Sequence, residues 1–75
     1  MADIRKLDLR LKRLRAIEGD YRSTLRRAED EHKHNLISKE KFLKIKAKQE
    51  AKIEKILPKV RRLQHLRNEM KERSE

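Results

Sequence analysis

The sequence contains no cysteine and no tryptophan, and it has one glycine, one proline and two aromatic residues, Tyr21 and Phe42. Without cysteine, neither a disulfide framework nor a cysteine metal site can form. A single glycine excludes the glycine-rich loops that cradle phosphate. No stretch approaches the roughly 18 consecutive apolar residues of a membrane span, and no apolar segment typical of a secretory signal follows the first residue. We therefore expect a soluble, cytoplasmic protein without enzymatic activity.

What the chain does contain is charge. Its 75 residues include 23 Lys and Arg against 13 Asp and Glu, which gives a formal net charge of +10. Lys, Arg, Glu, Leu and Ala dominate, and these are strong helix formers, whereas disordered chains are enriched in Pro, Ser and Gly. A chain of this length forms at most one domain. The composition predicts a single, strongly basic, helical unit over residues 1–75.

Apolar residues recur at spacings of three and four along two segments, which is typical of one face of an α-helix. No segment alternates with a period of two, so no strand is expected. We predict an all-α fold with helices over residues 3–34 and 39–73 joined by a turn at 35–38. The expected core positions are Ile4, Leu7, Leu11, Leu14, Ile17, Tyr21, Leu25 and Ala28 in the first helix, and Phe42, Ile45, Gln49, Ile53, Ile56, Val60, Leu63, Leu66 and Met70 in the second.

The turn carries its own signals. Asn35 tolerates the left-handed conformation that ends many helices, and we expect Leu36 to pack back on the last turn. Ser38 is a good N-cap, and Glu40 favours the positive helix N-terminus. Because so short a connection makes neighbouring helices antiparallel, the predicted shape is a helical hairpin.

The two helix breakers fall close together in this hairpin. Folding the chain about Leu36 or Ile37 places Pro58 opposite about residue 15, within roughly one turn of Gly19. A proline inside a helix removes a hydrogen bond and kinks the axis. Two interpretations stay open, a shared static bend and a hinge that opens the free end of the hairpin.

The residue before each core position of the second helix is basic seven times in succession. On the matching flank of the first helix, Asp3 and Asp20 are the acidic residues. These flanks face one another in an antiparallel pair, so two acids cannot neutralise them. The candidate nucleic-acid-binding residues are Lys6, Arg10, Arg13, Lys41, Lys44, Lys48, Lys52, Lys55, Lys59 and Arg62.

On the opposite flank we expect the charges to be paired, because Arg22 and Arg26 should lie near Glu50 and Glu54 and form salt bridges with them. The excess charge is also uneven along the hairpin. Residues 5–15 and 59–73, which meet at the free end, hold twelve cations against three acids.

A localised basic field favours a polyanionic partner, and we predict binding to the phosphate backbone of nucleic acid, duplex DNA before RNA. Asn and Gln occur twice each and both aromatic residues lie on the core stripe, so little sequence preference is expected. Nucleoid association would follow from DNA binding. The alternative is a coiled-coil oligomerisation or scaffold module that binds an acidic protein.

A two-helix hairpin buries little apolar area and is marginal on its own. Leu9, Leu43 and Leu57 fall off the main stripe and suggest a second packing surface. We therefore expect a homodimer or a higher homo-oligomer, the dimer forming a four-helix bundle that could bridge two DNA segments, with a monomer as the alternative. No membrane and no small-molecule substrate are expected as partners.

The segment Asn35-Leu36-Ile37-Ser38-Lys39-Glu40-Lys41-Phe42, followed by Lys46, resembles the core of the SHOCT family of short helical modules. That family carries Gly-x-Ile-Thr-x-Glu-x-Phe-x-x-x-Lys between two helices; here Asn35 replaces the glycine and Ser38 the threonine. The resemblance covers the turn region, residues 28–49, and implies a small interaction or oligomerisation module.

The composition also resembles hyperthermophile usage, because Lys, Glu and Arg are abundant and Asn, Gln and Met are scarce. The chain is similar in size and charge to the small basic chromatin proteins of archaea.

Three histidines are present, and none predicts a metal site. His32 and His34 are two apart and do not share a helix face, and His65 belongs to the other end of the hairpin. Glu29-x-x-His32 has the spacing of half a di-iron motif, but such a site needs a second copy and two further carboxylates. We expect surface histidines, no metal and no cofactor.

Overall fold

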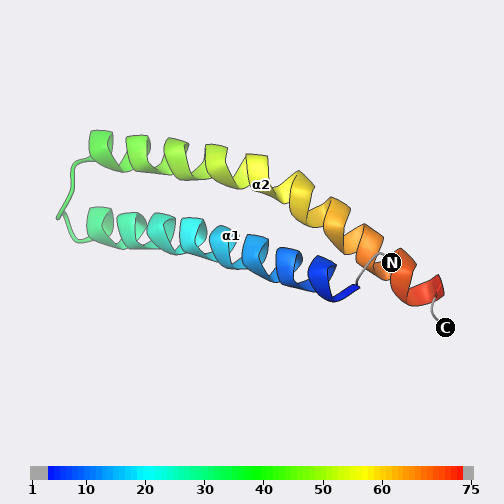
Figure 1. Cartoon of the computed structure of the whole chain (residues 1–75). Coiled ribbons are helices and arrows are strands. Elements are labelled where there is room, and N and C mark those ends of the chain that lie inside the picture. Colours follow the sequence, from blue (N-terminus) through cyan, green and yellow to red (C-terminus); the bar gives the residue numbers. More distant parts are fainter. Residues whose placement is uncertain (1–3, 74–75) are drawn as a thin grey trace.

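The computed structural model describes residues 4–73 as two α-helices, α1 (Ile4–Lys33) and α2 (Lys39–Arg73). The helices run antiparallel and pack side by side in a hairpin of 54 × 16 × 15 Å (Figure 1). Residues 4–73 contain no strand, so the predicted all-α hairpin is confirmed. The expected first residue of the first helix, residue 3, lies outside the described residues, and His34 belongs to the turn. Neither described helix has the length and apolar character needed to cross a membrane.

A left-handed residue ends α1. Asn35 adopts a φ of 60°, its amide donates to the carbonyl of His32 at 3.0 Å, and the amide of Leu36 donates to the carbonyl of Glu31 at 2.8 Å. These two bonds form a Schellman motif, which satisfies carbonyls that the helix end leaves without partners. The expectation that Leu36 packs back is wrong, because its side chain is 74% exposed.

The start of α2 is capped as predicted. The Ser38 hydroxyl accepts a hydrogen bond from the Lys41 amide at 3.1 Å, and the Ser38 carbonyl accepts one from the Phe42 amide at 3.0 Å. The Phe42 ring stacks on His32 of α1, with ring centroids 4.8 Å apart. The turn therefore fixes the end of α1 and the start of α2, and it brings His32 and Phe42 into contact between them.

One apolar seam joins the helices. Leu11, Ile56 and Val60 form a buried cluster against which Leu14, Tyr21 and Leu63 pack. Ala28, Ile53 and Gln49 are also buried, so the expected glutamine position in the core is confirmed. Tyr21 faces Lys52 and Asp8 faces Arg67. This pairing lies within two residues of the register expected from folding about Leu36 or Ile37.

The seam departs from the predicted stripe at two positions. Ile17 is 40% exposed and Leu66 is 39% exposed, whereas the side chains of Glu18 and Arg67 are 19% and 32% exposed. Alternating steps of three and four residues from Leu14 lead to 18 and 21, and steps from Leu63 lead to 67 and 70. A pair of long helices follows this period of about 3.5 residues. The seam thus turns Ile17 and Leu66 onto one flank.

Both helix breakers lie within continuous helix. α2 remains helical through Pro58, and Figure 1 shows that it changes direction in the yellow part of the ribbon, close to this proline, while α1 bends more gently in the same sense. Gly19 has no positive φ, and a Cβ added there would meet no atom within 4 Å. No packing or turn requirement calls for the glycine at position 19.

We predict that Gly19→Ala stabilises the hairpin by roughly 0.5–1 kcal/mol, because alanine loses less backbone entropy on helix formation. Thermal unfolding followed by circular dichroism should show a melting temperature several degrees higher. Ala16→Gly, at an exposed position one turn earlier, is the matched control and should lower it by a similar amount. A lower melting temperature for Gly19→Ala would show that the position needs glycine.

Candidate nucleic-acid interface

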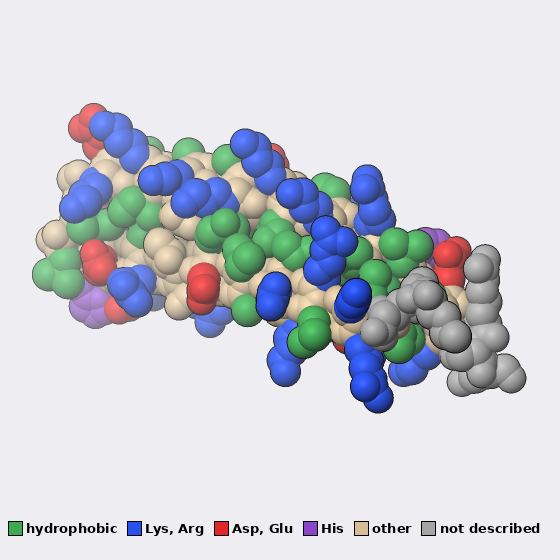
Figure 2. Space-filling view, in the orientation of Figure 1, with side chains coloured by type: hydrophobic (Ala, Val, Ile, Leu, Met, Phe, Trp, Pro, Cys, Tyr) green, Lys and Arg blue, Asp and Glu red, His purple; other side chains and the backbone are tan. Residues whose placement is uncertain are grey.

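The basic strip of α2 consists of the seven residues that precede the core positions: Lys41, Lys44, Lys48, Lys52, Lys55, Lys59 and Arg62. All except Lys52 are exposed. Figure 2 shows Lys and Arg side chains along α2 at the edge of an apolar band that follows the seam. The helical period therefore places these cations on one flank, beside the contact between the helices.

Two members of the basic strip have partners within the hairpin. The Lys44 ammonium lies 3.9 Å from the Glu40 carboxylate, and both side chains are largely exposed. The Lys52 ammonium lies over the Tyr21 ring at 5.4 Å from its centroid. A cation in such a position is attracted to the negative face of the ring.

Cations from both helices meet in a groove near the free end. This free-end groove has a volume of about 590 Å³ and is lined by Arg10, Arg13, Leu14, Ile17, Lys59, Arg62, Leu63 and Leu66. Its floor is apolar, and its rim carries four of the ten predicted binding residues. None of the lining residues is acidic.

A smaller hollow continues along the seam. It has a volume of about 280 Å³ and shares Leu14, Ile17 and Lys59 with the free-end groove. Lys52 and Lys55 line it as well. Lys6, Lys41, Lys44 and Lys48 line neither hollow, so the structure gathers six of the ten predicted residues and leaves these four along the flank.

The rim cations have no acidic partner among the residues that the structure describes. Among residues 4–73, no ion pair involves Arg10, Arg13, Lys59 or Arg62. Of the two acids expected on this flank, Asp20 is exposed and Asp3 lies outside the described residues. Gathering like charges across a seam costs stability unless an anion binds there.

The predicted salt-bridge set on the opposite flank is wrong. The Arg22 guanidinium instead donates to the Glu18 carboxylate one turn earlier, at 2.7 Å. Within residues 4–73, no ion pair joins Arg22 or Arg26 to Glu50 or Glu54. Glu18 lies nearer because residues four apart are neighbours on one helix.

An ion pair between Asp8 and Arg67 joins the two helices near the free end. This pair was not predicted from the sequence, because the predicted apolar stripe passes through Leu66 and leaves Arg67 facing outward. The step from Leu63 to Arg67 and on to Met70 is the signal that could have found it.

The histidines serve local contacts. His34 donates from Nδ1 to the carbonyl of Asp30 at 2.8 Å, and Nε2 of His65 lies 3.1 Å from Glu69. His32 is engaged with the Phe42 ring. Among the described residues, no group of three or more His, Asp or Glu side chains could hold a metal ion.

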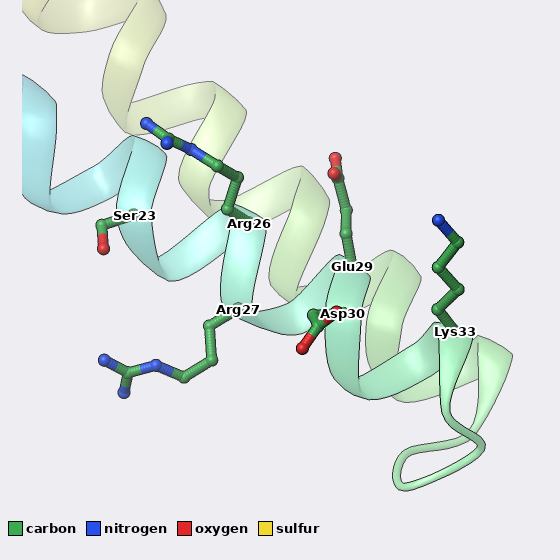
Figure 3. Close-up of a pocket in the computed structure, with 6 residues that line it drawn as sticks. All are labelled: Ser23, Arg26, Arg27, Glu29, Asp30 and Lys33. Carbon is green, nitrogen blue, oxygen red and sulfur yellow. The ribbon is translucent and has the colours of Figure 1, made fainter.

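A further hollow of about 650 Å³ lies on α1 alone, near the turn, and is lined by Ser23, Arg26, Arg27, Glu29, Asp30 and Lys33. Figure 3 shows Arg26, Glu29 and Lys33 on one side of the helix and Arg27 and Asp30 on the other. Cations and acids alternate there, so this hollow offers no focused positive field.

No protein-family model, curated protein or solved structure matches this chain. The likeness of the turn region to SHOCT modules stays a prediction.

Exposure predicts unequal contributions of the seam leucines to stability. Leu11→Ala should lower the free energy of unfolding by about 2–4 kcal/mol, because its side chain is buried and leaves a cavity. Leu66→Ala, which removes the same atoms from an exposed position, should cost less than about 1 kcal/mol. Urea unfolding of both variants measures the difference, and equal costs would place Leu66 in the core.

Proposed function

We propose that the protein binds nucleic acid without enzymatic activity, contacting backbone phosphates through the basic strip and the rim of the free-end groove. One observation carries this proposal. Two cations of α1, Arg10 and Arg13, and two of α2, Lys59 and Arg62, line the free-end groove together, and no acidic residue lines it. Such a field attracts a polyanion, and phosphate contacts gain free energy by releasing condensed counterions.

The length of the strip suits a helical polyanion. Lys41 and Arg62 are about 32 Å apart along α2 at 1.5 Å per residue, a distance over which a DNA duplex carries on the order of twenty phosphates. Arginine at three of the four rim positions can also contact phosphate in a bidentate manner. Several phosphates can therefore be contacted at once.

Little sequence preference is proposed. Tyr21 and Phe42 are half-buried, one beneath Lys52 and the other stacked on His32, so neither offers a surface on which unpaired bases could stack. Backbone and shape recognition remain, with duplex DNA as the first candidate and RNA as the second. In a cell, DNA binding of this kind would associate the protein with the nucleoid.

We also propose a homodimer in which a second copy covers the flank opposite the basic strip. The hairpin exposes 6582 Å², against about 4,900 Å² for a compact monomer of its 9.1 kDa mass. Leu43 is 48% exposed and Leu57 half-buried, and both lie on that flank of α2, about 21 Å apart. Leu9 lies on α1 and is 58% exposed. A four-helix bundle built this way leaves two basic strips outside, able to bridge two duplexes.

Two adjacent arginines provide a matched test of phosphate binding. Arg62→Glu should weaken binding to a short DNA duplex roughly tenfold. It should also reduce the slope of log affinity against log salt concentration by about one, the value for one lost phosphate contact. Arg61→Glu makes the same change in net charge on the opposite flank and should weaken binding much less. Fluorescence anisotropy at several salt concentrations measures both, and equal losses would show that only net charge matters.

The dimer predicts a mass in solution near twice 9.1 kDa. Light scattering coupled to size exclusion should report it, and Leu43→Gln together with Leu57→Gln should shift the mass toward the monomer. A monomeric mass for the unmodified chain at high protein concentration would contradict the dimer. It would not bear on the phosphate contacts, which the anisotropy measurements test separately.

A further inference from the structure

The free-end groove combines two features that a phosphate backbone does not need together. Its rim is cationic, but its floor is formed by Leu14, Ile17, Leu63 and Leu66. Ile17 and Leu66 are the two seam residues that the helical period turns outward. Apolar side chains at the centre of a groove gain free energy only when another apolar surface covers them.

We infer that the free-end groove binds an acidic amphipathic α-helix of a partner protein. A helix fits the shape, because a third helix can lie along the line between two antiparallel helices and bury its apolar face against both. From Arg10 to Ile17, and from Lys59 to Leu66, the groove extends about 10 Å, or two helical turns. This length matches a partner helix with apolar anchors at i, i+3 or i+4, and i+7.

The rim determines the charge of the occupant. Arg10 and Arg13 stand on one side of the floor and Lys59 and Arg62 on the other, with no acidic residue among the lining residues. Glu and Asp beside the apolar face of a bound helix would meet a cation on either side, and such complementary charges speed association and exclude wrong partners. A second copy docked through the same groove fits poorly, because the rim cations of the two copies would then face one another with no acidic residue between them.

This inference is independent of nucleic-acid binding, because the apolar floor discriminates between the two ligands. Both a duplex and an acidic helix would use the rim cations, so the two would compete for the free-end groove. Only the helix would use Ile17 and Leu66. Substitutions at these two positions therefore separate one interaction from the other without changing the net charge.

The test uses a synthetic helical peptide of leucine on one face and glutamate on the other, labelled for fluorescence anisotropy. A scrambled peptide of identical composition is the control for charge. The unmodified protein should bind the amphipathic peptide at least roughly tenfold more tightly than the scrambled one, because only the first presents a continuous apolar face. Equal affinity for both peptides, or no binding of either, would overturn the inference.

Variants of the floor locate the site. Ile17→Gln and Leu66→Gln should each weaken peptide binding roughly tenfold while leaving affinity for the DNA duplex unchanged. Leu9→Gln, at an exposed leucine outside the groove, is the matched control and should leave peptide affinity unchanged. Glutamine keeps a high helix propensity, and circular dichroism checks that each variant is folded.

Two results would identify another occupant. If Leu66→Gln lowers the mass of the protein measured by light scattering, a second copy fills the groove and the inference is wrong. If the floor variants weaken DNA binding as much as peptide binding, the groove belongs to the nucleic-acid interface. The comparison of the two peptides uses the unmodified chain, so the inference remains testable even if a floor variant fails to fold.

Discussion

A single apolar seam between two helices is the constraint on which the rest of this molecule depends. Leu11, Ile56 and Val60 are buried on it, and no second layer of structure covers the outer faces of α1 and α2 within residues 4–73. Each helix can bury only a narrow stripe, so the remaining side chains lie on flanks and outer faces. In a chain with 23 basic residues, the direction of the seam therefore decides where the positive charge collects.

Much of this arrangement follows from local sequence. Asn35 can adopt a left-handed φ and Ser38 can cap a helix, so the turn and the antiparallel register were predictable to within two residues. The strip from Lys41 to Arg62 also follows from periodicity.

The predictions that were wrong depend on small rotations of the helices and on how far a side chain can reach. At Ile17 and Leu66 the difference between periods of 3.6 and 3.5 residues reverses which neighbour faces inward, and Arg22 meets Glu18 one turn away before it can reach across to α2. Leu36 shows the same limit, because the backbone motif at Asn35 forms without its apolar contact.

The two flanks of the hairpin differ in charge, and a different partner is proposed for each. The flank with Leu43 and Leu57 carries both signs of charge, which permits close approach of a second copy. The flank with the free-end groove carries cations and an apolar floor, which favours an anionic partner. A chain with so small a core is marginal in isolation, and any partner that binds only the folded state adds to its stability by mass action. Binding of either proposed partner would therefore be coupled to folding of the hairpin.

The register of the seam is the central claim, because every assignment of a residue to a flank follows from it. Nuclear Overhauser effects between methyl groups test it directly in protein with labelled Leu, Ile and Val. The structure predicts cross-peaks from the Leu11 methyls to those of Ile56 and Val60. They should persist when labelled chains are diluted into unlabelled ones, because the contacts lie within one chain. Intact helices without these cross-peaks, or cross-peaks that disappear on dilution, would contradict the hairpin and the charge distribution built on it.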